Sequence, residues 1–540
     1  MGLAYARAEG FLPSFNRPKL DRAAAMVPST DLVDRIKEIE DAADAARAPQ
    51  RRLSEQERVR HAKLEEIRAA GMEPYALGCE RTDVAAGVRD RHRGLAPDTR
   101  TGEVVAIAGR VVLAREHGRL IFVTLRDETA DLQVMLTSDS LGAESLRRWK
   151  ALIDLGDQVG VRGEVVTSRR GELSVLASSW TLAAKCLRPL PNKRSGLSDP
   201  EARVRQRYVD FIVNDESRRM LRMRGDAVAA VRDGLRARGY LEVETPMLQP
   251  VHGGATARPF TTRINAYNMQ LYLRIAPELY LKRLLVGGVG RVFELNRNFR
   301  NEGVSHKHNP EFTMLEAYEP YGDYDTMAEL TRSLVVDAAR AALGTTVVVR
   351  DGVEYDLAEP WQEITVYESV SKALGEEVTP DTPQAHALAL AERLGVNADP
   401  RWGQGKIVQE LFEAAVEEDL KAPTFVRDYP AETSPLTRPH RADPRLAEKW
   451  DLIVFGLELG TAYSELIDPI LQRERLTEQS LQAAGGDPEA MDLDEDFLRA
   501  LEYAMPPPGG MGMGIDRLLI TLTGRSIRET IPFPLVRPGS

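Results

Sequence analysis

Residues 291–318 read RVFELNRNFRNEGVSHKHNPEFTMLEAY and set the architecture of the second half of this 540-residue chain. Two β-rich runs, VFELN and FTMLEAY, flank a polar segment, so the stretch predicts two strands joined by a loop. The loop carries Arg300, Glu302, His308 and Asn309. Because the planar fork of an arginine can hold a phosphate and a carboxylate, this loop is suited to bind a nucleotide.

A second segment lies upstream of this unit, where a helical pattern runs into GYLEVETPMLQP at residues 239–250. Gly239 is expected to end the helix, Tyr240 to open the strand YLEVET, and Pro246 to close it. The sequence therefore predicts a long helix and a strand before the nucleotide loop.

A third segment, GGMGMGIDRLLITLTG, occupies residues 509–524. Gly509, Gly510, Gly512 and Gly514 would let the backbone approach a ligand closely. The helix expected from Ile515 onward presents the positive end of its dipole to that ligand. This segment predicts a glycine-rich turn into a helix.

Together the three segments resemble the signature motifs of class II aminoacyl-tRNA synthetases, and the resemblance covers nearly everything after residue 54. It implies that ATP is a substrate, that the chain forms a homodimer through the first segment, and that Arg300, Glu302 and Arg517 are catalytic. Phe312 would stack on adenine, with Glu302 on the adenine amino group and Arg517 on the γ-phosphate. The ATP-binding set that the resemblance implies is Arg300, Glu302, His308, Asn309, Phe312, Glu458, Gly514 and Arg517.

The stretch WDLIVFGLELGTAYSELID, residues 450–468, supplies the metal prediction. Asp451 and Glu458 match the family's positions for Mg²⁺, an ion that prefers hard oxygen ligands. Seven residues apart on an unbroken strand, the two carboxylates would face opposite sides. Gly456 is therefore expected to mark a turn or bulge between them.

Acidic residues point to lysine as the amino acid. A buried ammonium needs carboxylate partners to offset its desolvation. The resemblance narrows to lysyl-tRNA synthetases, with Glu465 expected on the ε-ammonium, Glu278 on the α-ammonium, and Gly254 leaving space for the substrate backbone. The implied lysine-binding set is Gly254, Glu278, Arg300, Glu316, Tyr318, Thr461, Tyr463 and Glu465.

Composition limits the function classes. A formal net charge of −11 argues against a protein that coats nucleic acid by bulk attraction, so any RNA contact must be local. No apolar stretch is long enough for a membrane span and no secretory signal opens the chain, so a cytoplasmic location without membrane insertion is expected. Cys79 and Cys186 lie far apart, which favours reduced thiols over a disulfide or a zinc site.

Residues 104–185 contain five short β-rich runs and one intervening helical pattern. This arrangement is typical of an OB-type barrel. By itself, Phe122 in such a run would be read as a core aromatic. The resemblance instead implies that Phe122 and Gln133 read the anticodon of a lysine tRNA, with Arg110 and Glu172 as further contacts.

The expected fold class is α+β, an N-terminal OB-fold β-barrel joined to a class II catalytic domain built on an antiparallel sheet flanked by helices. The expected domains are a tail or linker at 1–50, a helical segment at 51–102, the anticodon-binding barrel at 103–190, a hinge at 191–216, and the catalytic domain at 217–540 with a helical insertion at about 363–418. Within the helical segment, Ser54 and Glu57 predict a capping box.

Three positions depart from the commonest sequence pattern of lysyl-tRNA synthetases. This chain has Asp451 where Glu is usual, Thr461 where Asn is usual, and Tyr463 where Phe is usual. These variants are similar to the synthetase half of actinobacterial fusions that lysylate phosphatidylglycerol, so lysyl-tRNA for lipid lysylation, through a membrane lysyltransferase, is a second possible use. The alternatives are a lysine ligase that modifies a protein, which the barrel disfavours, and an inactive tRNA-binding paralogue, which the intact motif residues disfavour.

Overall fold

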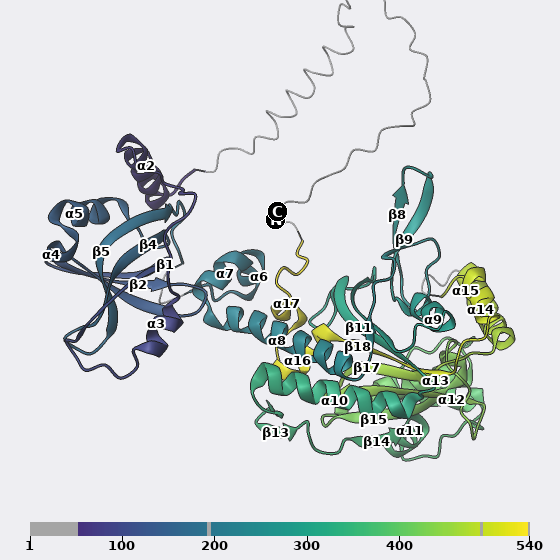
Figure 1. Cartoon of the computed structure of the whole chain (residues 1–540). Helices are drawn as coiled ribbons and strands as arrows, with labels where there is room; N and C mark the ends of the chain where they lie inside the picture. The colour runs from purple at the N-terminus through teal and green to yellow at the C-terminus, as the bar shows by residue number, and fades with distance from the viewer. Residues whose placement is uncertain (1–51, 192–195, 486–489, 538–540) are drawn as a thin grey trace, which may run out of the picture. The chain divides into compact units, whose positions relative to one another are not determined.

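The computed structural model describes residues 52–191, 196–485 and 490–537, and the expected tail at 1–50 lies outside these residues. The chain divides into two compact units, one on each side of the junction between residues 190 and 191. Figure 1 shows both units. Within the described residues, no helix combines the length and the apolar character that crossing a bilayer requires.

The first unit opens with helix α2, Glu55–Ala69. Ser54 and Glu57 form the expected capping box, and Gly71 follows the helix with a φ of 69°. The capping box gives hydrogen-bond partners to two backbone N–H groups at the start of the helix. The helix ends at a glycine, which adopts the left-handed conformation without steric strain. A shorter helix, α3, spans Ala85–Arg91.

The rest of the first unit is a closed barrel with the strand order β1-β2-β3-β5-β4. Side chains alternate along its strands, so that apolar residues such as Val123 and Val134 fill a common core while their neighbours face outward. The expected OB-fold barrel is therefore confirmed. Its elements are β1 (Arg100–His117), β2 (Leu120–Arg126), β3 (Asp131–Thr137), α4 (Ser138–Leu141), α5 (Ala143–Leu152), β4 (Gln158–Thr167) and β5 (Leu173–Ala184).

The second unit is built on an eight-stranded sheet with the order β14-β15-β16-β17-β18-β11-β10-β6. Its pairs are antiparallel, except for β6 with β10 and β14 with β15, which are parallel. The strands are β6 (Leu241–Glu242), β10 (Val292–Phe299), β11 (Glu311–Pro320), β14 (Gln362–Thr365), β15 (Thr424–Pro430), β16 (Leu446–Val454), β17 (Leu457–Ser464) and β18 (Pro508–Gly514).

Helices α8 (Asp215–Ala237), α10 (Tyr324–Leu343) and α16 (Ile515–Thr523) pack apolar stripes against this sheet and share one core with it (Figure 1). The expected α+β class II fold is confirmed.

Helices α11 (Val366–Leu374), α12 (Gln384–Leu394) and α13 (Gln404–Ala415) form a second core against β15. The remaining elements are α6 (Pro200–Arg205), α7 (Arg207–Val213), β7 (Leu248–Gln249), β8 (Phe260–Ile264), β9 (Met269–Leu273), α9 (Glu278–Val286), β12 (Val347–Arg350), β13 (Val353–Asp356), η1 (Glu417–Asp419), η2 (Ala431–Thr433), α14 (Pro469–Ala484), α15 (Glu495–Leu501) and α17 (Ile527–Thr530).

Two local predictions were wrong. The expected strand YLEVET is reduced to Leu241–Glu242, because this edge strand pairs with β10 at those two residues alone. The glycine run is not a turn but the central strand β18, which pairs with β17 and β11 on its two sides. A strand tolerates glycine in its interior when a ligand or another side chain must come close.

Candidate active site

A cavity of about 480 Å³ opens in the second unit. Its walls come from the β10–β11 loop, strands β11, β17 and β18, the segment around Gly254, and helices α13 and α16. The cavity brings together every residue of this unit that the sequence singled out for ATP, metal or lysine, apart from Glu465. Those lining residues are Gly254, Glu278, Arg300, Glu302, His308, Asn309, Phe312, Glu316, Tyr318, Asp451, Glu458, Thr461, Tyr463, Gly514 and Arg517.

Arg300 begins the loop after β10, and its backbone N–H donates to Pro310 at the loop's far end (2.9 Å). Its guanidinium lies over the ring of Phe312, 5.2 Å from the centroid, and its buried Nε donates to no acceptor among the described residues. Burial lowers the pKa of Arg300, while Glu302 acts in the opposite direction. Because a buried cation with an unused donor attracts anions, Arg300 is ready to hold a phosphate or carboxylate.

Arg517, in the first turn of α16, points across the cavity toward β17. Its Nη1 donates to the carbonyl of Glu458 at 2.8 Å and lies 3.3 Å from the Glu458 carboxylate. Its Nη2 lies 3.5 Å from Nε2 of His308, whose pKa burial lowers, with Arg517 adding to the effect. A guanidinium and a neutral imidazole thus face the same end of the cavity.

Asp451 and Glu458 share the cavity because of two backbone features. Phe455 and Gly456 take positive φ values of 57° and 71° in the turn between β16 and β17, and the register shifts after Leu452. The extra residue on β17 brings Glu458 to the face that already holds Asp451. The turn expected at Gly456 is confirmed, and the bulge lies further along β17, at Leu459.

The two carboxylates differ in their surroundings. One oxygen of Asp451 lies 3.0 Å from Nζ of Lys449, and the other is buried without a well-formed hydrogen bond, although the Tyr429 and Thr461 hydroxyls lie nearby. Burial raises the pKa of Asp451. Burial acts the same way on Glu458, but Arg517 and Lys449 outweigh it and hold that pKa below its usual range. A buried oxygen without a well-formed hydrogen bond, beside a second carboxylate, suits a divalent cation.

Another end of the cavity, formed by Glu278, Glu316 and Tyr318, holds carboxylates that have little contact with solvent. Glu278 and Glu316 are each under one-tenth exposed, and the hydroxyl of Tyr318 donates to Glu316 at 3.3 Å. Burial raises the pKa of Glu316 well above its usual range, and the negative charge of Glu278 adds to the shift. Such a site gains most from a ligand that brings positive charge.

Glycines make room for this end. Gly510, Gly512 and Gly514 alternate along one face of β18, while Met511 and Met513 enter the core on the other. A Cβ on Gly510 would lie within 2.5 Å of Tyr318 and closer still to Glu465, so no side chain fits there. Gly254 has a φ of 83°, which a larger residue adopts only with strain.

Glu465 lies directly behind this wall rather than on it. Only 2% of the residue is exposed, and one carboxylate oxygen lies 2.6 Å from Nζ of Lys282 on α9. Its backbone N–H donates to Pro508 at 3.0 Å, and Leu466 donates to Leu436 at 3.1 Å. The backbone on both sides of the carboxylate is therefore fixed.

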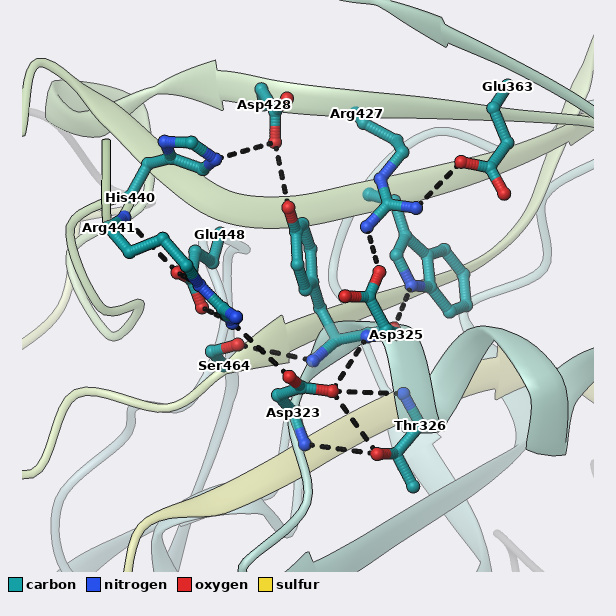
Figure 2. A network of polar contacts seen from close by, with 12 residues as sticks. Asp323, Asp325, Thr326, Glu363, Arg427, Asp428, His440, Arg441, Glu448 and Ser464 are labelled. Carbon is teal, nitrogen blue, oxygen red and sulfur yellow. Dashed lines mark hydrogen bonds and ion pairs between the residues drawn. The ribbon is translucent and has the colours of Figure 1, made fainter. Parts of the chain in front are cut away.

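Figure 2 shows the polar network that anchors the preceding residue, Ser464. Asp323 caps α10 by accepting from the backbone of Asp325 and Thr326 at 3.1 Å each. The next backbone N–H, that of Tyr324, donates to Oγ of Ser464 at 3.2 Å, and the Trp450 indole donates to the Tyr324 carbonyl at 2.7 Å. The start of α10 is thus tied to both β16 and the end of β17.

Sequence reasoning missed several residues of this region. Lys282 could have been noticed, because it stands four residues after Glu278 on a helix, where side chains meet. Glu413 and Glu417, from α13 and the turn after it, also line the cavity, and burial raises the pKa of Glu417 to about 7, with Glu458 adding to the shift. No local pattern marks that contact.

The barrel gathers three of its four singled-out residues on one outer face. The registers of β1, β2 and β3 place Arg110, Phe122 and Gln133 on that face, and Phe122 is outside the barrel core. Gln133 donates to Oγ of Ser174 at 2.9 Å, and Arg110 donates to the carbonyl of Gly156 at 2.7 Å. Glu172 precedes β5 and lies 3.9 Å from Arg89.

The family models that match describe both units. Residues 199–537 match a model described as tRNA synthetases class II (D, K and N), and residues 105–183 match one described as an OB-fold nucleic acid binding domain.

Curated relatives extend the similarity over most of the chain. The chain is 56% identical to the lysine–tRNA ligase of Kineococcus radiotolerans and 57% identical to that of Mycolicibacterium gilvum, each across 90% of this chain and 98% of the relative. It is also 52% identical to the lysylphosphatidylglycerol biosynthesis bifunctional protein LysX of Mycolicibacterium vanbaalenii, across 92% of this chain but 45% of that protein.

Proposed function

The chain belongs to the class II tRNA synthetases of the D, K and N group, and on this premise we propose that it is a lysine–tRNA ligase that uses ATP to join L-lysine to a lysine tRNA. The observation that carries the choice of lysine is the cavity itself. Glu278 and Glu316 line one end of it, with Arg300 in the same cavity. A dibasic amino acid adds positive charge to this group of buried carboxylates, of which Glu278 already has Lys282 as a partner.

The first step forms lysyl-adenylate. The lysine carboxylate attacks the α-phosphorus of ATP in line, the bond to the β-phosphate oxygen breaks, and pyrophosphate leaves. Arg300 contacts both the attacking carboxylate and the α-phosphate and stabilises the charge that passes between them. Phe312 stacks on adenine, Glu302 accepts from its amino group, and Arg517 with His308 holds the γ-phosphate end.

The second step transfers lysine to tRNA. A terminal ribose hydroxyl of the tRNA attacks the adenylate carbonyl, and AMP leaves with the electrons of the broken anhydride bond. The protein contributes positioning and fixed charges rather than a covalent intermediate.

Asp451 and Glu458 fit a Mg²⁺ ion, because the buried oxygen of Asp451 and the Glu458 carboxylate border the same cavity. When bound, this ion neutralises phosphate charge in the transition state. The protein's own part is to hold the two carboxylates, with Lys449 beside Asp451 and Arg517 beside Glu458.

The barrel reads the anticodon in this proposal. Phe122 offers a partly exposed aromatic face for an unpaired base, and Gln133 and Arg110 lie on the same outer surface. Two copies of the chain associate through the segment before the nucleotide loop, where Leu241, Met247 and Leu248 expose about half of their surface. The site of action is the cytoplasm, where free tRNA is charged.

The deciding experiment is aminoacylation of purified tRNA with each standard amino acid in turn. Lysine alone should be attached, with AMP and pyrophosphate as products. A protein lysine ligase would instead label a protein and leave tRNA uncharged, and an inactive paralogue would fail to exchange pyrophosphate into ATP when lysine is added.

A second use of the product is supported by the similarity to LysX, whose name describes lysylphosphatidylglycerol biosynthesis. Lysyl-tRNA made by this chain would then supply lipid lysylation. Deletion of the gene should lower the content of lysylated phosphatidylglycerol, and an unchanged content would contradict this use.

A further inference from the structure

Lys282 is a fully buried lysine on α9, behind the lysine end of the cavity. Its Nζ lies 2.6 Å from one oxygen of Glu278 and 2.6 Å from one oxygen of Glu465, and its side chain has no exposed surface. The two glutamates are the pair that the family resemblance assigns to the two ammonium groups of substrate lysine. The mechanism proposed above gives Lys282 no part.

The surroundings of Glu465 make this contact significant. Its second oxygen, Oε1, is buried without a hydrogen-bond donor among the described residues and packs against Gly510 and Tyr318. Its backbone is fixed on both sides by Pro508 and Leu436. One ammonium therefore holds one half of the carboxylate, while the other half has no polar partner and stands next to the cavity wall.

Charge balance shows what the buried ammonium adds. In the loaded site, where bound lysine favours ionised carboxylates, Glu278, Glu316 and Glu465 bring three negative charges to this end of the cavity, and a substrate carboxylate brings a fourth. Arg300, the two ammonium groups of lysine and Lys282 bring four positive charges. Without Lys282, the loaded site would hold an unbalanced buried anion, which a protein normally avoids by protonating one carboxyl.

We propose that Lys282 is a positioning and specificity-determining residue that binds Glu278 and Glu465 together as one charge-paired unit and thereby matches the cavity to a dibasic amino acid. This inference rests on the proposed lysine ligase activity and names the device that sets its substrate charge. Lys282 itself does not line the cavity, so it acts through the two glutamates.

The electrostatics agree with this arrangement. Burial alone would lower the pKa of Lys282, but Glu278 and Glu465 outweigh it and raise that pKa, so the ammonium stays charged. Burial raises the pKa of Glu465 to about 8, against the opposing effect of Lys282, and Glu278 adds to the rise. The charged and titratable groups that face this carboxylate are Lys282 and Glu278 on α9 and Tyr318 on β11.

The test is lysine-dependent exchange of pyrophosphate into ATP by the full chain, which needs no tRNA. Lys282→Met removes the charge at nearly constant volume. We expect the KM for lysine to rise on the order of 10- to 100-fold at neutral pH, with the KM for ATP within about twofold, because one partner of a buried charge pair is lost. Part of the loss should be recovered as the pH rises, because a growing share of Glu465 then ionises.

A matched control is available in the barrel. Lys185 is also fully buried and also lies between two carboxylates, Asp154 and Asp157. Lys185→Met should leave both KM values for exchange unchanged. An unchanged lysine KM in Lys282→Met, equal losses for lysine and ATP, or a loss that does not depend on pH would overturn the proposal.

A double variant covers the case in which Lys282→Met does not fold. Lys282→Met with Glu465→Gln removes a charge and its partner together, a change that buried sites often tolerate. If Lys282 acts through Glu465, the double variant should lose less lysine affinity than the product of the two single losses, or, without a folded single variant, no more than Glu465→Gln loses alone. A larger loss would contradict the proposal.

The outcomes separate two kinds of failure. If the unmodified chain shows no lysine-dependent exchange, the proposed function fails. If it shows exchange with normal lysine selectivity and Lys282→Met behaves like the unmodified chain, only the role of Lys282 fails.

Discussion

The barrel and the catalytic unit each bury one lysine completely between two carboxylates, and the two sites differ in how well they are satisfied. In the barrel, Nζ of Lys185 donates to the carbonyl of Leu152 at 2.7 Å, to Asp154 at 2.7 Å and to Asp157 at 2.8 Å. All three of its protons are used. In the catalytic unit, Lys282 contacts Glu278 and Glu465, and a Glu465 oxygen is left without a donor.

This difference indicates that the network around Lys185 supports the fold, whereas the network around Lys282 is completed by a ligand. A buried polar network that satisfies every donor and acceptor rigidifies the fold. A network that leaves buried acceptors unused costs stability and persists where a ligand completes it. The unused oxygens of Glu465 and Asp451 and the unused Nε of Arg300 all occur at or just behind the cavity.

The largest loss of activity should follow a substitution in the cavity of the catalytic unit. Arg300→Ala is expected to lower pyrophosphate exchange on the order of 10³-fold, because it removes a preorganised donor to the developing charge. Thermal unfolding should change little, since the Arg300 side chain supports no other described side chain by a hydrogen bond. Retained exchange in a folded Arg300→Ala protein would refute its catalytic role.

A substitution at the buried lysine of the barrel should lower stability and leave activity unchanged. Lys185→Met is expected to lower the free energy of unfolding of the barrel by about 3–5 kcal/mol, because Asp157 would keep a buried charge without its partner. Exchange activity at a temperature where the protein is folded should be retained. Urea denaturation followed by the fluorescence of the two barrel tryptophans, Trp149 and Trp180, measures the first effect. Loss of exchange activity without loss of stability would contradict the view that Lys185 has a structural role and Lys282 a role in substrate binding.

Glu465→Gln sharpens the comparison within the cavity. The KM for lysine should rise about 10- to 100-fold, whereas the KM for ATP should change by about twofold or less, because an amide cannot pair with an ammonium as a carboxylate does. The same assay with ATP as the varied substrate is the control. Equal losses for the two substrates would assign Glu465 to the fold rather than to lysine.

A pH series offers a gentler test on the unmodified chain. Burial raises the pKa of Glu465 to about 8, so in the protein without lysine a growing share of its carboxyl is protonated below that pH, and binding of an ammonium must displace that proton. The KM for lysine should therefore fall, by about tenfold between about pH 7 and about pH 9, as the carboxyl ionises. A KM that rises over this range would contradict the assignment.

The smallest effect is expected at the outer face of the barrel. Phe122→Ala should weaken tRNA binding by about 1 kcal/mol, the lower end for the loss of one stacked base, without changing pyrophosphate exchange. Aminoacylation kinetics with tRNA as the varied substrate provide the measurement. Val123→Ala, a core position next to it, is the matched control, since it should cost stability instead of tRNA affinity.

Much of this molecule could be predicted from local patterns. The capping box at Ser54 and the barrel strands follow from signals within a few residues of each element. The glycine run was misread because the same residues suit a turn and a central strand, and only pairing with β17 and β11 distinguishes the two.

The sequence by itself determined the family, the two units and the residues that meet in the cavity, because those motifs keep their residues close together along the chain. Only the tertiary structure decided that Glu465 stands behind the wall, paired with a lysine far away in sequence, and that α13 and η1 close the cavity with Glu413 and Glu417. Such contacts depend on how helices and strands pack in space, and no periodicity within either segment encodes its distant partner.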